Sequence, residues 1–367
     1  MFNSLNKVIV IIFLLSSFLL KTTTVPYLVT LGMVFLCLLS FIRKGVRKEY
    51  LAFVFFYFFF HFFYILYGLL SGADYTHALV NFSGFLLIPV YLVYWSYYKL
   101  DLEKVTNIVL LICTPIVIFM YFTGRSQLGD ADVVEDVSLL RRLFLSCSFF
   151  YVGFIFNYLF VKKTNENILR KLSFVFFFSG VAVLASFSKV VFLLLIVFFC
   201  FWFVANYKKA SLILFLILFV IGYLNLSEIF HFAEPFFAGY DVNSSGNKLR
   251  SEQLNYLLND VSYFGSGLGV YIDGFSRRTQ GYGIELTYFN LLHKFGVFSM
   301  FYFLYFFIPI ILSFFRLFFY RIKKYDSTCF LVFPIVFSSA LNPMLSAPVV
   351  LFFVSYWWYM FIEDNLE

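Results

Sequence analysis

The residues best suited to chemistry lie between Gly246 and Gly296, the one long polar stretch in an otherwise almost continuously apolar sequence. Its first part, residues 246 to 260, is predicted to form a helix capped by Ser244 or Asn247. Arg250 shares a helical stripe with the apolar residues at positions 254, 257, 258 and 261. A guanidinium group on such a stripe needs an anionic partner, because an unpaired buried charge is costly. The pattern indicates anion binding, with pairing to an acidic side chain or extension to the membrane surface as alternatives.

A glycine-rich turn follows this helix, with glycines at positions 265, 267 and 269. Glycine has no Cβ and adopts positive φ angles, so the backbone of such a turn can approach a ligand closely. The turn lacks the lysine and the serine or threonine of a phosphate-binding P-loop. We therefore expect a flexible turn beside a ligand, and the motif alone does not specify which ligand.

The sequence as a whole has the composition of a membrane protein. Of its 367 residues, 62% are hydrophobic, 24% are aromatic and 13% are charged. Apolar runs long enough to cross about 30 Å of hydrocarbon alternate with short polar or basic segments. Ordinary soluble domains do not have this profile. The basic residues mark the ends of the apolar runs and do not cluster on one face, so the net charge of +7 does not indicate nucleic-acid binding.

We predict a single integral membrane domain over residues 1–367, an all-α transmembrane helix bundle of about twelve spans. The predicted spans are residues 4–20, 24–42, 50–70, 79–98, 106–123, 143–161, 172–187, 190–206, 211–225, 286–318, 328–341 and 347–362. The first has no signal-peptide cleavage site after it and is expected to remain as a span. The tenth is longer than one crossing, so its first part, residues 286–294, is expected to run along the interface or inside the protein.

Short basic loops set the expected orientation, because loops rich in lysine and arginine stay in the cytoplasm. These loops are residues 43–48, 99–104, 162–171, 208–209 and 316–324. Both termini are then cytoplasmic. Two long segments, 124–142 and 226–285, lie on the outer, periplasmic side, and the second contains the short helix and the glycine turn.

Neither metal nor disulfide chemistry is expected. The acidic residues between Asp130 and Asp136 lack the spacing of metal ligands, which favours a solvated loop. The five cysteines fall in or beside predicted spans and show no C-x-x-C spacing.

The order of motifs resembles that of bacterial O-antigen polymerases, the Wzy-type proteins, which share a superfamily with O-antigen ligases. The resemblance rests on Arg250, the glycine turn at 265–269, and the segment from Glu285 to Gly296. Residues 188–189 and 339–343 extend it over nearly the whole chain. O-antigen ligases have a His-Asn pair where this chain has Glu285, so the resemblance favours a polymerase and carries no histidine role over to His293.

This resemblance implies a metal-independent glycosyltransferase without a cofactor, built as a glycosyltransferase-C-like helix bundle in the bacterial inner membrane. Its donor would be a glycan on undecaprenyl pyrophosphate. Its acceptor would be a sugar hydroxyl on a second lipid-linked repeat unit. Membrane lipids and a chain-length regulator would be further partners, and nucleic acid would not.

In such a polymerase, fixed charges must stabilise the lipid pyrophosphate as it leaves. The resemblance implies Glu285 and Arg250 as catalytic residues and four basic residues as pyrophosphate or substrate contacts: Arg142, Lys189, Arg277 and Arg278. A guanidinium group can bind two pyrophosphate oxygens at once, and a carboxylate can take the proton of an attacking hydroxyl. Each basic residue has an alternative as a lipid-phosphate anchor or solvated charge. Glu285 has an alternative as a carboxylate that stabilises a helix N-terminus.

Other functions stay open on the sequence. An O-antigen ligase would use the same donor with lipid A core as its acceptor. A flippase or transporter of lipid-linked oligosaccharide would carry charges inside the bundle at mid-membrane, whereas this chain concentrates charge in an outer loop. A membrane acyltransferase would need an early histidine, and only His61 or His77 could serve. Single histidines of this kind are usually satisfied polar residues.

Overall fold

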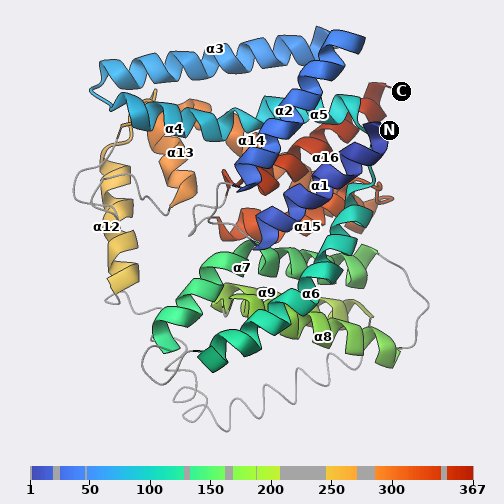
Figure 1. The fold of residues 1–367 in the computed structure, drawn as a ribbon. Coiled ribbons are helices and arrows are strands. Elements are labelled where there is room, and N and C mark those ends of the chain that lie inside the picture. The colour runs from blue at the N-terminus through green and yellow to red at the C-terminus, as the bar shows by residue number, and fades with distance from the viewer. Residues whose placement is uncertain are drawn as a thin grey trace.

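The computed structural model describes residues 2–19, 25–45, 48–127, 133–161, 168–186, 188–206, 245–270, 286–339 and 345–366, and every regular element in them is a helix (Figure 1). The elements are α1 (Phe2–Leu19), α2 (Val25–Lys44), α3 (Lys48–Leu70), α4 (Tyr75–Phe85), α5 (Leu87–Tyr97), α6 (Leu102–Gln127), α7 (Val133–Phe156), η1 (Asn157–Val161), α8 (Ile168–Ser186), α9 (Lys189–Asn206), α12 (Ser245–Asn259), α13 (Thr287–Phe295), η2 (Gly296–Ser299), α14 (Met300–Phe319), α15 (Asp326–Ser338) and α16 (Pro348–Leu366).

These helices coincide with all the predicted spans except the ninth, 211–225, which lies outside the described residues. Within the described residues, six helical segments are long and apolar enough to cross a membrane. They are Val25–Arg43, Tyr50–Leu70, Leu102–Thr123, Phe144–Val161, Leu169–Ser186 and Thr287–Phe319. The chain is therefore an α-helical membrane protein.

Two predicted spans are each divided into two helices. Residues 79–98 correspond to α4 and α5, which are separated at Leu86. Residues 286–318 correspond to α13 and α14, which are separated by the 3-10 turn η2. Gly296 begins that turn with a φ of 54°, a value that glycine adopts without the strain of other residues. The tenth predicted span therefore contains a helix break between its first part, residues 286–294, and the part expected to cross the membrane.

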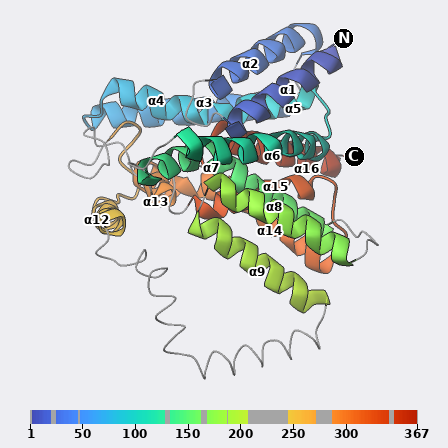
Figure 2. The ribbon, with the colours of Figure 1, turned by 60° about the horizontal axis from the view of Figure 1, so that its bottom comes forward.

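Helix α7 lies at the centre of the bundle, packed against α8 and α15 (Figures 1 and 2). In the candidate span Phe144–Val161, which consists of the second half of α7 and of η1, 83% of residues are buried, while the other five candidate spans do not exceed 33%. A Cβ at Gly153 would lie 2.5 Å from the carbonyl oxygen of Leu331 in α15, so the two backbones touch. Small residues serve this purpose in membranes, where lipid is as apolar as leucine and helices associate through close packing.

Three of the five loops predicted to be cytoplasmic, residues 43–48, 99–104 and 316–324, meet at one end of the bundle, which we call the terminal end because both termini lie there (Figure 1). The contacts join Tyr97 to the Gly45 carbonyl (2.9 Å), Lys324 to Asp101 (2.7 Å), Lys323 to Asp364 (3.1 Å) and Ser327 to Glu103 (2.6 Å). Burial raises the pKa of the Asp101 carboxyl, but its hydrogen bonds and nearby lysines outweigh burial and hold this pKa below its ordinary value. These contacts place the three loops at one end of the bundle, and the side of the membrane that this end faces stays a prediction.

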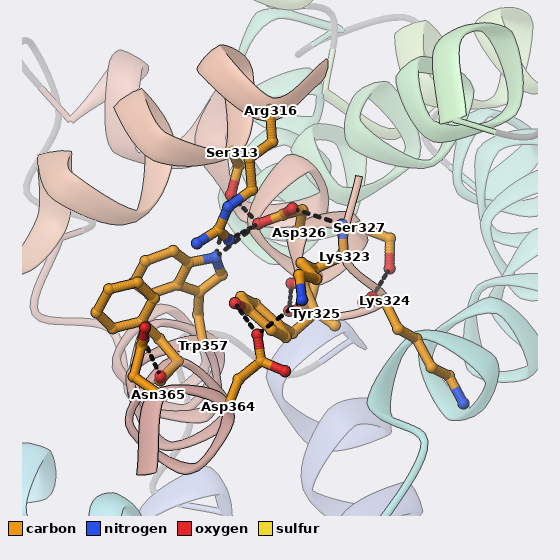
Figure 3. A network of polar contacts seen from close by, with 12 residues as sticks. Ser313, Arg316, Lys323, Lys324, Tyr325, Asp326, Ser327, Trp357, Asp364 and Asn365 are labelled. Carbon is orange, nitrogen blue, oxygen red and sulfur yellow. Dashed lines mark hydrogen bonds and ion pairs between the residues drawn. The ribbon is translucent and has the colours of Figure 1, made fainter. Parts of the chain in front are cut away.

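Asp326, the first residue of α15, is fully buried and joins the helices of the terminal end (Figure 3). Its carboxylate accepts hydrogen bonds from Ser313 (2.8 Å), Arg316 (2.9 Å), the backbone amide of Lys323 (2.9 Å) and the indole of Trp357 (3.2 Å). The guanidinium of Arg316 also lies 5.9 Å from the centre of the Trp357 ring. A buried carboxylate is stable here because each neighbour donates to it or opposes its charge.

Asp326→Asn should lower the free energy of unfolding by roughly 3 kcal/mol, because Arg316 loses the partner of a largely buried ion pair. Denaturant titration in detergent micelles measures this change. The matched control is Asp364→Asn, since the side chains of the Lys323–Asp364 pair are 50% and 40% exposed. Exposed pairs contribute at most about 1 kcal/mol. Equal losses in the two variants would contradict the structural role of Asp326.

Candidate functional site

Three segments meet at the opposite, far end of the bundle: the last turns of α3, residues 262–269, and residues 293–297 of α13 and η2. Backbone hydrogen bonds join them, from Ser266 to His293 (2.8 Å), from Gly267 to Lys294 (3.0 Å), from Leu268 to Tyr64 (3.0 Å) and from Val297 to Tyr263 (3.0 Å). The Tyr64 hydroxyl also lies 3.0 Å from the carbonyl oxygen of Phe264 and 3.1 Å from that of Phe295. We call residues 64–68, 262–269 and 293–297 the glycine clamp.

The glycines of the clamp allow its backbones to touch. Gly265, Gly267, Gly269 and Gly296 have φ angles of 77°, 89°, 84° and 54°. A Cβ at Gly267 would lie 2.4 Å from the Cα of Gly68, and one at Gly265 would lie 2.4 Å from the carbonyl oxygen of Lys294. Both distances are too short for a side chain. The close backbone approach predicted for these glycines is present, and its partners among the described residues are backbone segments of the chain itself. Contact of this turn with a ligand stays a prediction.

Gly269 packs against the start of α4, which Asp74 caps. A Cβ at Gly269 would lie 2.6 Å from the backbone nitrogen of Ala78. Asp74 accepts hydrogen bonds from the amides of Thr76 (2.8 Å) and His77 (3.1 Å). The His77 bond is the main reason that the pKa of Asp74 lies below its ordinary value. The clamp therefore also fixes the position of the turn between α3 and α4.

His293 is the centre of a polar cluster beside the clamp. The side chain of His293 is fully buried, and its Nε2 lies 2.8 Å from Oδ2 of Asp260, whose side chain is 63% exposed. The hydroxyl of Ser266 lies 3.3 Å from the same nitrogen. The short contact to a carboxylate indicates that Nε2 carries a proton and donates it to Asp260. Among the described residues, Nδ1 of His293 has no hydrogen-bond partner.

Lys294 follows His293 and is also buried, with 4% of its surface exposed. Its ammonium group lies 3.4 Å from the carbonyl oxygen of Val270. No carboxylate of the described residues lies within ion-pair distance of it. A buried ammonium group is stable only with an anion or several acceptors nearby, so this end of α13 can accommodate negative charge.

Helix α12, predicted after Ser244, is present and packs against α13, lying across the direction of α3 (Figures 1 and 2). Leu257 is buried against Leu286, with Leu254 beside them. Leu258 and Val261, which the helical spacing predicts on the same face, are 53% and 38% exposed. The apolar stripe is narrower than predicted, because α13 covers only one face of α12.

The side chains of the six predicted site residues fall outside what the structure describes. The backbones of Arg142, Lys189 and Arg250 are in α7, α9 and α12. Arg277, Arg278 and Glu285 lie outside the described residues, and so does most of the segment 226–285 that is predicted to form the large outer loop. The convergence of these six residues on a pyrophosphate therefore stays a prediction.

The acidic residues at 130–136 also have no described side chains. Among the described residues, no group of three His, Cys, Asp or Glu side chains could hold a metal ion. His61 is buried in α3, with Nδ1 2.8 Å from the carbonyl oxygen of Tyr57 and Nε2 hydrogen-bonded to the hydroxyl of Tyr302. Both ring nitrogens have partners, so the interpretation of His61 as a satisfied polar residue is confirmed.

The sequence patterns do not single out Asp260 or Lys294, although both belong to this end of the bundle. One signal was present, because residues 287–295 form a short amphipathic helix whose buried face carries His293. A polar residue on a buried face needs a partner. Nothing in the spacing identifies Asp260 as that partner, since 33 positions separate the two residues.

The chain matches no protein-family model, and no curated protein or solved structure shows significant similarity to it.

Gly267→Ala should open the clamp, because the new Cβ meets the backbone of Gly68 and the residue keeps a positive φ. Overpacking costs about 1–3 kcal/mol, and the left-handed backbone adds about 1–2 kcal/mol. The expected result is a clear drop in the melting temperature of the purified protein in detergent.

Two other glycines separate these contributions. Gly72 has a φ of 86° but open space around it, so Gly72→Ala should show only the backbone cost. Gly32 lies in a helix with open space, so Gly32→Ala should leave the melting temperature unchanged or slightly raised, because alanine favours a helix more than glycine does. If Gly267→Ala and Gly72→Ala lower the melting temperature by the same amount, the contact with Gly68 does not hold the clamp together.

Proposed function

We propose that this protein polymerises lipid-linked oligosaccharide repeat units at the outer face of the bacterial inner membrane. The growing glycan passes from undecaprenyl pyrophosphate to a sugar hydroxyl of another undecaprenyl-pyrophosphate-linked repeat unit. The proposal begins from the motif order of Arg250, residues 265–269 and residues 285–296. The observation that carries it is the joining of the second and third motifs by backbone hydrogen bonds at the far end of an apolar helix bundle.

The chemistry needs a cationic surface and a proton acceptor. The acceptor hydroxyl attacks the anomeric carbon, and the electron pair of the broken C–O bond leaves with the lipid pyrophosphate. Arg250, with Arg142, Lys189, Arg277 and Arg278, would bind the pyrophosphate. Glu285 is the carboxylate that the sequence offers for the proton. The donor already contains the bond whose cleavage drives transfer, so no cofactor enters the proposal.

The distribution of buried charge favours a reaction at the membrane surface over transport. Among the described residues, the buried charged side chains are Lys294 and Asp326, apart from the histidines. Lys294 belongs to the clamp at the far end, and Asp326 belongs to the network at the terminal end. A transporter would be expected to carry such charges near the middle of its bundle.

Deletion of the gene, followed by gel analysis of the surface polysaccharide, tests the proposal. Loss of a polymerase should leave chains of a single repeat unit on the lipid core. Complete absence of repeat units would instead indicate a ligase or a flippase. A normal ladder of long chains in the deletion strain would contradict all three functions.

Arg250→Ala should abolish long chains while membrane abundance stays normal, because removing one partner of a desolvated charge pair costs about 2–5 kcal/mol. Arg250→Lys should recover only part of the chain length, since an ammonium group cannot bind two oxygens in a plane. The measurement is the chain-length distribution at matched expression. Lys248→Ala is the control, because this exposed lysine lies on the same helix. Wild-type chains from Arg250→Ala would remove Arg250 from the site.

A further inference from the structure

The two side chains of the Asp260–His293 pair differ in their exposure to the surface. The imidazole is fully buried, and the carboxylate is 63% exposed. A substrate at the surface of the protein can therefore reach Asp260 but not the ring of His293. This is the reverse of the arrangement in which a histidine meets the substrate and a buried carboxylate orients it.

Among the described residues, only one oxygen of Asp260 has a hydrogen-bond partner. Oδ2 accepts the hydrogen bond from His293, and none of the described residues donates to Oδ1. The carboxylate thus keeps lone pairs on its exposed side, where a substrate hydroxyl could donate. A general base needs this geometry before anything else.

The pair is held in place from both sides. The amide of Asp260 donates to the carbonyl oxygen of Tyr256 in the last turn of α12 (3.0 Å), and the amide of Ser266 donates to the carbonyl oxygen of His293 (2.8 Å). The ring of His293 is buried next to the glycine clamp. Groups fixed in this way lose little freedom when a substrate binds, which is the condition for efficient catalysis.

We infer that Asp260, in place of Glu285, is the catalytic carboxylate that takes the proton of the acceptor hydroxyl, and that His293 is its positioning residue. The inference rests on the proposed function. As the hydroxyl oxygen bonds to the anomeric carbon, its proton passes to Oδ1 of Asp260. The C–O bond to the pyrophosphate breaks, and undecaprenyl pyrophosphate leaves with the electron pair. The protonated carboxyl group then returns its proton to water on its exposed side.

A purely structural pair would respond differently to substitution. Asp260→Asn keeps the length of the side chain and an oxygen that accepts from His293, but it has no basic oxygen. Asp260→Glu keeps the carboxylate but moves it by one methylene. A base requires the carboxylate, so Glu should be more active than Asn. A structural contact requires the shape, so Asn should be more active than Glu.

The test uses the full-length purified protein and lipid-linked repeat units extracted from the deletion strain. Asp260→Asn should lower kcat by about 10²–10⁴-fold with KM little changed, and Asp260→Glu should retain more of kcat. His293→Ala should also lower kcat, and His293→Gln, which keeps an N–H donor, should restore part of it. Glu252→Gln, on α12, is the control for an amide substitution and should behave as wild type.

The outcomes separate the inference from the proposed function. If wild-type protein makes no polymer from these units, the proposed function fails. If wild type polymerises and Asp260→Asn matches it, or if Asn exceeds Glu, Asp260 is not the base. Loss of activity in Glu285→Gln with full activity in Asp260→Asn would assign the base role to Glu285 and overturn the inference.

Discussion

Backbone contact at glycine positions is the constraint on which the rest of this structure depends. In the bundle, Gly153 lets α7 touch the backbone of α15, and at the far end Gly68 and Gly267 let α3 touch the turn after α12. The hydrophobic effect does not drive helices together in lipid, so close packing and hydrogen bonds must drive their association. The same contacts that hold the helices together therefore fix the short polar segment from which the candidate site is built.

Charge is divided between the two ends of the bundle. At the terminal end, Asp326 is surrounded by donors and an arginine, and its role is structural. At the far end, His293 and Lys294 are buried with fewer hydrogen-bond partners among the described residues, and the side chain of Asp260 is exposed. A network in which every polar group has its hydrogen bonds stabilises the fold. Buried polar groups that lack hydrogen bonds mark places where a substrate can supply the missing partners. This difference is why the proposed chemistry is assigned to the far end.

Sequence patterns predict the helices well, because runs such as residues 50–70 have one stable state in lipid, in which every backbone group is bonded within the helix. They also predict α12 and the break near Gly296. They do not predict which segments meet. The glycines at 265–269 indicate a close approach, but their partners, Gly68 and Lys294, come from distant parts of the chain. The contact between Asp260 and His293 depends on that docking, so no local pattern contains it.

The central claim, that the clamp and its polar cluster face outward, is tested most directly by cysteine labelling in intact cells. Ser71, in the exposed turn after α3, and Lys324, whose side chain is 71% exposed at the terminal end, are each replaced by cysteine. The exposed native Cys200 is replaced by serine, since the other four cysteines are buried. A membrane-impermeant maleimide should label Ser71→Cys in intact cells and Lys324→Cys only after the membrane is opened. The reverse pattern would place the clamp in the cytoplasm and contradict the account.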